Sequence, residues 1–322
     1  MSTTAEQMIE PDLARTPAIP RLTGVFPIAP TPFHPNGDLD LDGMKRVLDC
    51  MIDQGVDGIC ILANFSEQFL LTDAERDVLT GLCLDHVAGR VPVIVTTSHF
   101  STRIAAERGA RARAAGAAML MMMPPYHGAS LRAGEQGVIE HFAAVAQTSG
   151  LPIMVQDAPM SGVTLSPAFL ARLARDVPLV SYFKIEVPFA AAKLRDLIAQ
   201  GGASIVGPFD GEESITLMAD LDAGATGTMC SALLPEKIKT VVTLHREGRR
   251  AEAAAAYMRI LPLINHENRQ CGLRAAKTVL MEGGVIRSDA VRHPLEPLHA
   301  QTRDSLLELA READVLALRW GK

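Results

Sequence analysis

Lysine is scarce in this sequence, and so are aromatic residues. Of the 31 basic residues only seven are lysines, and aromatic residues make up 4% of the 322 positions. A lysine is almost never fully buried without a partner or a task. With so few lysines, any one that falls in an apolar segment is therefore informative.

Cysteine is scarce as well, and the spacing of the cysteines does not indicate disulfide bonds. The five cysteines include no CxxC pair and no metal-ligand spacing: Cys50, Cys60, Cys83, Cys230 and Cys271. An odd number without such spacing argues against a disulfide framework and against a structural zinc site. The pattern fits a reducing compartment, so we expect a cytoplasmic protein.

Long apolar runs and an excess of positive charge are also missing. No apolar run reaches the roughly 18 residues of a membrane-spanning helix, so we expect no membrane partner. The net charge of -6 leaves no basic footprint for nucleic acid. A chain that is 48% hydrophobic and 21% charged is globular rather than disordered. Residues 1–20 have the features of neither a signal peptide nor a transit peptide, and we expect a flexible tail there.

Short apolar runs alternate with amphipathic stretches from Gly24 onward. The runs predict strands at 25–28, 58–62, 93–97, 118–122, 153–156, 180–185, 205–207 and 227–229. The stretches between them predict helices at 41–54, 73–87, 101–115, 134–148, 167–175, 189–199, 214–222 and 235–246. Most runs are continuous, which is typical of parallel strands buried on both faces.

Eight strand–helix pairs in this order predict an α/β fold, the (β/α)8 TIM barrel. A doubly wound sheet is the alternative, but it needs a glycine-rich turn after its first strand, and here the prolines of residues 29–33 exclude one. Further helices are expected at 249–263, 273–282 and 302–312. The expected organisation is a tail over 1–20, the barrel over 21–246 and a C-terminal helical cap over 247–322.

Two lysines fall in apolar segments. Lys184 lies in the run 180–187, which otherwise has the pattern of a buried strand, and active sites of such barrels lie at the carboxyl ends of the strands. Burial should lower the pKa of this amine and leave a nucleophile that can form a Schiff base. The alternative is a structural lysine paired with Glu186 or another carboxylate. For Lys277 we expect a stem packed along the cap with its head in water.

Metal and phosphate chemistry are both disfavoured. The candidate metal ligands lie on separate loops without ligand spacing: His99, His127, Asp157 and Asp210. We therefore expect no metal and no other cofactor. The run 207–213 holds three carboxylates and no basic residue, which disfavours a phosphorylated substrate. The polar run 266–270 is expected to form a turn between two helices.

Several motifs resemble the superfamily of dihydrodipicolinate synthase and N-acetylneuraminate lyase over roughly residues 22–300. They are the run 24–33, Glu67, Pro125-Tyr126, Lys184 and the run 224–228. The resemblance implies a barrel followed by a helical bundle, a homotetramer, and a Schiff base between Lys184 and a small 2-oxo acid. It implies no metal.

The sequence departs from that superfamily at two places. The usual Gly-Thr-Thr-Gly-Glu loop is here Ala63-Asn64-Phe65-Ser66-Glu67, which leaves Ser66 and backbone amides to hold the substrate carboxylate. Gln156 stands where the superfamily has a catalytic tyrosine, and Met160-Ser161 replaces the arginine that follows it in dihydrodipicolinate synthase. The missing arginine argues against condensation with a second acidic substrate.

Four longer runs, 156–159, 183–186, 207–213 and 265–270, resemble the sugar-acid dehydratase branch of the superfamily. This resemblance implies the conversion of L-2-keto-3-deoxyarabonate into 2,5-dioxopentanoate and water. Two alternatives stay open. One is a retro-aldolase that releases pyruvate from a 2-keto-3-deoxy sugar acid, and the other is a non-catalytic sugar-acid-binding protein.

The resemblance and the strand ends together define the expected site. The expected catalytic residues are Lys184, Gln156, Tyr126 and Glu186. The acid that helps the hydroxyl leave is expected among Tyr126, His127 and a water held by Gln156 and Asp157. The expected substrate-binding residues are Asn64, Phe65, Ser66, Thr97, His127, Asp157, Gly207 and Asp210.

Overall fold

A parallel sheet forms the wall of a barrel in the computed structural model, which describes residues 19–128 and 131–322. Within these residues the sheet has eight strands in the order β1-β10-β9-β8-β7-β4-β3-β2. Parallel bridges from Ile28 to Cys60 and to Ser231 connect its two edges and close the barrel. The strands are β1 (Gly24–Val25), β2 (Ile59–Ile61), β3 (Val93–Thr96), β4 (Met119–Met122), β7 (Ile153–Asp157), β8 (Val180–Ile185), β9 (Gly207–Asp210) and β10 (Gly227–Thr228). The predicted TIM barrel is confirmed.

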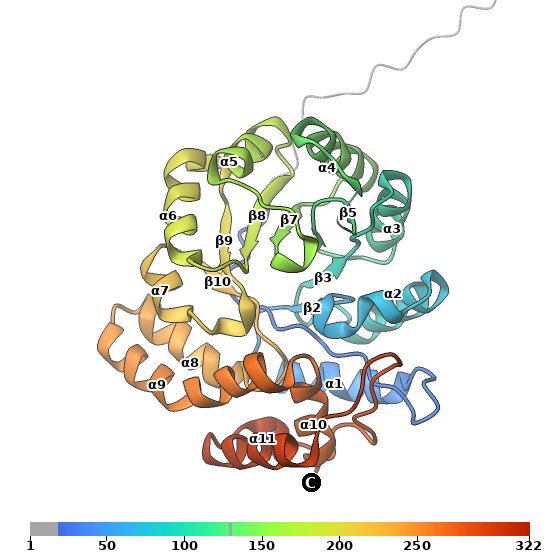
Figure 1. The fold of residues 1–322 in the computed structure, drawn as a ribbon, viewed down its shortest axis with the longest axis vertical. Coiled ribbons are helices and arrows are strands. Elements are labelled where there is room, and N and C mark those ends of the chain that lie inside the picture. Colours follow the sequence, from blue (N-terminus) through green and yellow to red (C-terminus); the bar gives the residue numbers. More distant parts are fainter. Residues whose placement is uncertain (1–18, 129–130) are drawn as a thin grey trace, which may run out of the picture.

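Helices surround this barrel (Figure 1). They are α1 (Leu41–Asp53), α2 (Asp73–Val87), α3 (Thr102–Ala114), α4 (Glu135–Ser149), α5 (Pro167–Asp176), α6 (Ala190–Gly201), α7 (Leu217–Asp222) and α8 (Pro235–Arg246). Local sequence explains where several of them begin. Thr72 and Glu75 form a capping box at the start of α2, and the Ser166 side chain accepts from the Phe169 amide at the start of α5.

Side chains of each strand alternate between the barrel interior and the helical layer. Tyr182 of β8 and Phe209 of β9 belong to the interior cluster, with their rings at 6.1 Å between centroids. Phe183, between Tyr182 and Lys184, belongs instead to the larger core under the helices. The alternation follows from the two-residue period of a strand, and it places Lys184 inside the barrel.

Strand β9 lies further along the chain than predicted. We expected the strand over 205–207 with Gly207–Asp210 as the loop after it, but these four residues are the strand and all are buried. Pro208 lies within this strand, and its carbonyl accepts from the Thr226 amide at 2.8 Å. Gly207 therefore lies at the start of the strand, where a side chain would collide with the Tyr182 ring.

The chain continues after α8 into a helical extension made of α9 (Arg250–His266), α10 (Arg274–Glu282) and α11 (Ala300–Glu312), which pack on one another beside α8 and α1 (Figure 1). Residues Glu267–Cys271 form a π-helical segment that continues α9. The turn expected over 266–270 is therefore wrong. The division into a barrel over 21–246 and a cap over 247–322 stays our proposal, with its boundary between α8 and α9.

The predicted tail over 1–20 falls outside the described residues except for its last two, Ile19 and Pro20. Tyr182, at the amino-terminal end of the barrel interior, donates its hydroxyl to the Pro20 carbonyl and accepts from the Leu22 amide at 2.9 Å. Across residues 19–128 and 131–322, no helix is both long and apolar enough to cross a membrane.

Candidate active site

A cavity of about 200 Å³ opens at the carboxyl ends of the barrel strands. Gln156 of β7 and Lys184 of β8 are direct partners in the sheet register, so their side chains enter the cavity side by side. Five of the predicted site residues line the cavity: Asn64, Phe65, Gln156, Lys184 and Glu186. Its other lining residues are Ile28, Ala63, Ala158, Pro159, Met160, Glu212 and Glu213.

Lys184, which is buried, and Glu186, which is 12% exposed, form an ion pair in this cavity. They lie two residues apart at the end of β8 and so share a face, and the Lys184 amine contacts a Glu186 carboxylate oxygen. Gln156 Nε2 donates to the same carboxylate at 3.1 and 3.3 Å. Gly211 makes room for this arrangement, since a Cβ there would lie 2.4 Å from the Glu186 side chain.

The charge state of Lys184 differs from our expectation. Burial lowers the pKa of the amine, but the negative charges of Glu186 and Glu213 outweigh it, and the pKa lies above its ordinary value. The predicted net lowering is wrong because burial was considered without the carboxylates that the fold brings to the amine. The amine is thus charged at rest, and it becomes a nucleophile when its proton passes to Glu186.

The loop after β2 contributes one wall of the cavity. Asn64 and Phe65 line it and open a short 3-10 helix, η1 (Asn64–Ser66), whose leading N–H groups have no acceptor within the helix. Ser66 does not line the cavity. Its hydroxyl donates to the Ala29 carbonyl at 2.6 Å and accepts from the Ala63 amide at 3.1 Å. Ser66 therefore holds the loop in shape.

Three of the predicted substrate-binding residues face the helical layer instead. Asp157 forms an ion pair with Lys193 of α6 at 2.5 Å, and Asp210 accepts a hydrogen bond from Thr228. Thr97 adjoins Arg76 and Arg108 outside the barrel. The alternation along each strand turns them away from Lys184. A fourth predicted substrate-binding residue, Gly207, lies at the amino-terminal end of β9, away from the cavity. We therefore assign none of these four residues to the substrate site.

Tyr126 and His127 line a different cavity, of about 680 Å³. They form β5 (Tyr126–His127), which pairs with β6 (Leu131–Arg132). His99 and Gln68 also line this cavity, and Gln68 Nε2 donates to Asn64 Oδ1 at 2.6 Å. The loop 63–70 thus lies between the two cavities. Tyr126 and His127 are not beside Lys184 within this chain.

No group of three or more His, Cys, Asp or Glu side chains is placed to hold a metal ion anywhere in the described ranges 19–128 and 131–322. The cavity instead presents amides, carboxylates and one amine.

Glu213 is a cavity residue that sequence reasoning missed. Glu212, Glu213 and Ser214 all have positive φ (48°, 53° and 70°), a conformation that costs non-glycine residues energy and clusters at functional sites. Glu213 is 6% exposed, and burial raises its pKa well above the ordinary value, against the opposing effect of Lys184. The available signal was a pair of glutamates without a basic neighbour directly after a buried strand.

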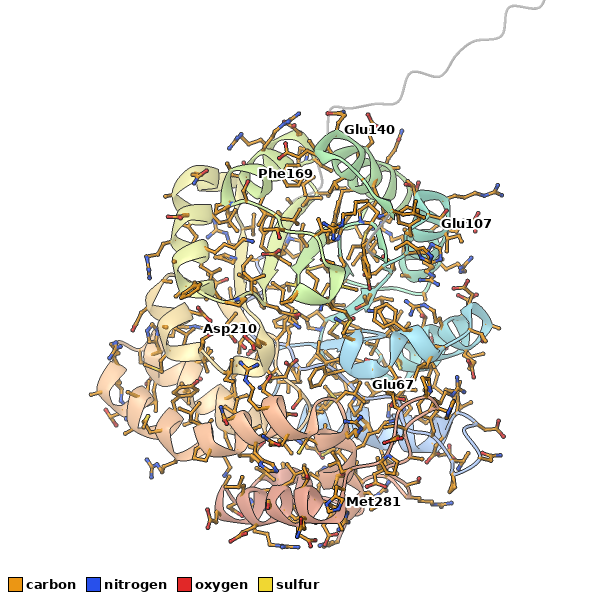
Figure 2. All side chains as sticks on the ribbon, in the orientation of Figure 1. Glu67, Glu107, Glu140, Phe169, Asp210 and Met281 are labelled. Carbon is orange, nitrogen blue, oxygen red and sulfur yellow. The ribbon has the colours of Figure 1, made fainter. Side chains whose placement is uncertain are left out.

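A second buried lysine–glutamate pair lies behind the loop. Lys277 of α10 has no exposed surface, and its amine donates to Glu67 and, at 2.8 Å, to the Ala290 carbonyl. Its amine also lies 4.3 Å from the centre of the Phe33 ring. The expectation that its head lies in water is wrong, because Glu67 is buried where α10 packs on the barrel. Figure 2 shows Glu67 beside α2, near the helical extension.

A lysine buried inside a barrel, at the carboxyl end of a strand and beside a carboxylate, defines the Schiff-base class of barrel enzymes. Residues 21–313 match the model of the dihydrodipicolinate synthetase family. The protein belongs to this family.

Individual relatives and structures agree with this assignment. The chain is 58% identical over 302 residues to an L-2-keto-3-deoxyarabonate dehydratase from Azospirillum brasilense, covering 94% of this chain and 98% of that protein. It is 32% identical over 305 residues to a 4-hydroxy-tetrahydrodipicolinate synthase from Xanthomonas axonopodis pv. citri, covering 92% and 96%. A crystal structure of dihydrodipicolinate synthase from Rhodopseudomonas palustris matches with a TM-score of 0.82 at 26% identity, covering 90% and 97%.

Proposed function

We propose that this protein is a hydro-lyase that converts L-2-keto-3-deoxyarabonate into 2,5-dioxopentanoate and water through a Schiff base on Lys184. The observation that carries the proposal is the charged Lys184 amine, enclosed in the cavity and paired with Glu186. The similarity to the Azospirillum brasilense dehydratase over nearly the whole chain supports the choice of substrate.

Lys184 and Glu186 begin the reaction. Glu186 takes the proton of the Lys184 amine, which then attacks C2 of the 2-oxo acid, and loss of water gives the protonated imine. The imine makes the C3 hydrogens acidic, and removal of one of them gives an enamine. The enamine expels the C4 hydroxyl as water. Loss of a C5 proton, return of a proton to C3, conversion of the resulting enol to the aldehyde and hydrolysis of the imine complete the reaction.

Two other parts of the cavity position the substrate and the base. The leading amides of η1, at Asn64 and Phe65, are suited to hold the C1 carboxylate because they point N–H groups out of the helix end. Gln156 holds Glu186 beside the amine through its two hydrogen bonds. Gln156 replaces a tyrosine of the superfamily, so the proton must reach the leaving group from elsewhere.

Borohydride trapping tests the proposal. Incubation with L-2-keto-3-deoxyarabonate and borohydride should add the reduced substrate to Lys184, as mass spectrometry of the digested protein would show. Lys193→Arg is the matched control, since the Lys193 side chain is only 12% exposed but lies on α6 and pairs with Asp157 on the outer face of the barrel wall. Lys193→Arg should still be labelled and Lys184→Arg should not. Folded wild-type protein that stays unlabelled would rule out a Schiff base.

Product analysis separates the two alternatives from the proposal. A retro-aldolase would break C3–C4 and release pyruvate and glycolaldehyde, whereas the dehydratase yields 2,5-dioxopentanoate alone. A non-catalytic sugar-acid-binding protein would yield neither product. The buried amine favours an enzyme, because a binding protein gains little from burying it.

We also propose a cytoplasmic homotetramer. The five cysteines are all buried and free, which suits a reducing compartment, and the tetramer follows from the resemblance to the superfamily. Light scattering on a sizing column tests the tetramer, and fractionation of cells tests the location.

A further inference from the structure

Three arginines gather where α2 and α3 meet the end of β3, outside the barrel and away from the active site. Arg76 of α2 and Arg108 and Arg111 of α3 line one cavity of about 10 Å³. Two of them have carboxylate partners on α2. Arg108 contacts Asp73 at 2.7 Å, and Arg111 contacts Asp77 at 2.9 Å. Three guanidinium groups therefore face two carboxylates, which leaves a surplus of one positive charge.

The surplus charge belongs to Arg76. This residue is 4% exposed, and within the described part of the chain it forms no ion pair. Its guanidinium donates to the Thr96 carbonyl, but a neutral acceptor does not balance a buried charge. Burial and the like charge of Arg108 lower the pKa of Arg76 to about 9, against the opposing effect of Asp73 and Asp77. The group is still charged at neutral pH, so it needs a negative partner.

A second polar group in this cavity needs a partner as well. The Thr97 hydroxyl is buried, and no residue in the ranges 19–128 and 131–322 forms a hydrogen bond with it. Most buried hydroxyls are hydrogen-bonded, and such an exception calls for an explanation. Thr97 directly follows β3 and lines the same cavity as Arg76. A hydroxyl and a guanidinium can both donate to one acceptor, and an anion serves both.

The size and the charge of the cavity narrow the choice of ligand. About 10 Å³ is the space of one water molecule or one monatomic ion, which excludes a phosphate or a sugar acid. A water molecule would satisfy the Thr97 hydroxyl but would leave the Arg76 charge unbalanced. The surplus of guanidinium groups disfavours a cation. Asp77 also lines the cavity, but it accepts a hydrogen bond from Arg111 at 2.9 Å, which offsets its charge.

We propose that this protein binds one chloride ion in the cavity between Arg76, Arg108 and Thr97. The ion accepts hydrogen bonds from the Thr97 hydroxyl and the Arg76 guanidinium, and it balances the surplus charge. Arg76 and Arg108 also donate to the carbonyls of Thr96 and Ser98, so the ion helps to hold α2 and α3 against the end of β3. Its role is to stabilise the fold, and it takes no part in the proposed reaction.

Bromide locates the site, because it resembles chloride chemically and scatters X-rays anomalously. Wild-type crystals soaked in sodium bromide should give an anomalous difference peak between Arg76 and Thr97. Thr97→Val crystals treated in the same way should give a weaker peak, since valine has the shape of threonine without its hydroxyl. A water molecule in this cavity of the wild-type protein, with no bromide peak, overturns the proposal.

The effect of chloride on stability shows whether the ion binds in solution. Binding to the folded protein raises the urea midpoint as chloride replaces gluconate at constant ionic strength, and the rise levels off when the site is filled. Thr97→Val should need at least about tenfold more chloride for half of this rise, because it loses a hydrogen bond to a charged group. Arg76→Met removes the surplus charge and should abolish the rise. Arg103→Met is the matched control, since Arg103 is an exposed α3 arginine that pairs with Glu107, and it should keep the wild-type rise.

Two further outcomes would overturn the proposal. A bromide peak without a chloride-dependent rise of the midpoint means an adventitious ion only. A rise that Thr97→Val shows at the same chloride concentrations as the wild type is a general effect of the salt. Thr97→Val alone decides this point if Arg76→Met does not fold. None of these results depends on borohydride labelling of Lys184, so the proposed function is tested separately.

Discussion

Two buried lysine–glutamate pairs lie on either side of the loop that follows β2, and they have opposite surroundings. Lys184 and Glu186 face the cavity, where Glu213 adds a further carboxyl group. Lys277 and Glu67 lie between the barrel and α10, where Arg292 is the neighbouring group. A further carboxyl group therefore lies beside the first pair, whereas beside the second pair the charges of Asp289 and Arg292 oppose each other.

This difference sets the pKa of each lysine in opposite directions. Burial lowers both, but around Lys184 the carboxylates outweigh it and raise the pKa. At Lys277 burial outweighs the attraction of Glu67, and the pKa falls to about 8. Two similar ion pairs therefore have lysines with different pKa values, because each pKa depends on the charged groups around the pair.

The second pair fastens the substrate loop to the helical extension. One oxygen of Glu67 accepts from the Lys277 amine, and the other accepts from the Arg292 amide at 3.0 Å. Arg292 in turn binds Glu75 of α2 and stacks on Phe33. Glu67 has a positive φ of 58°, so these contacts hold a strained residue directly after η1. Both oxygens of Glu67 accept hydrogen bonds, so this pair is suited to holding the loop in place. The Lys184–Glu186 pair lies beside the cavity and is suited to proton exchange.

The largest effect should come from removing the cavity lysine. Lys184→Met should lower kcat at least about 10⁴-fold, because no other amine lines the cavity. Steady-state assay of 2,5-dioxopentanoate measures this loss. Circular dichroism is the control for folding. A folded Lys184→Met protein with more than a hundredth of the wild-type rate would contradict the assignment.

Removing the lysine of the second pair should cost stability. Lys277→Met leaves the Glu67 carboxylate buried without its cation, which lowers the free energy of unfolding by about 3–5 kcal/mol. Urea denaturation measures it. Lys45→Met, which breaks the exposed Lys45–Asp42 pair, is the control and should leave the midpoint nearly unchanged. If Lys277→Met unfolds at as high a urea concentration as the control does, the Lys277–Glu67 pair does not stabilise the fold.

The burial of Glu267, in the π-helical segment after α9, should make stability depend on pH. Burial raises the pKa of Glu267 from 4.5 to about 8. The unfolded chain loses this proton above pH 4.5 while the folded protein keeps it until about pH 8, so stability is highest below pH 4.5 and falls as pH rises toward 8. Between pH 5 and 8 the loss is about 3 kcal/mol. The Glu267→Gln variant should lack this contribution when its free energy of unfolding is measured by urea denaturation at several pH values. A free energy of unfolding that changes with pH as steeply as that of the wild type would contradict the prediction.

The smallest effect should come from the residue that holds the base. Gln156→Met removes the two hydrogen bonds to Glu186, and loss of bonds to a charged group should lower kcat about tenfold or somewhat more. KM should change less than kcat, because Gln156 acts through Glu186. A change confined to KM would instead make Gln156 a residue that only binds substrate.

The sequence by itself determined the barrel and its central lysine. The period of the apolar runs places α2 and α8 at their observed bounds, and a lysine in a buried strand pointed to Lys184, because these signals are local. Tertiary structure alone decided which polar residues meet Lys184. Asp157 and Asp210 looked like site residues from their strands, but the two-residue alternation turned them outward. Glu213 and the Glu67–Lys277 pair were hidden because positive φ and contacts between residues 210 positions apart leave no local pattern. The scarce lysines were easy to find, yet only folding set the charges around them.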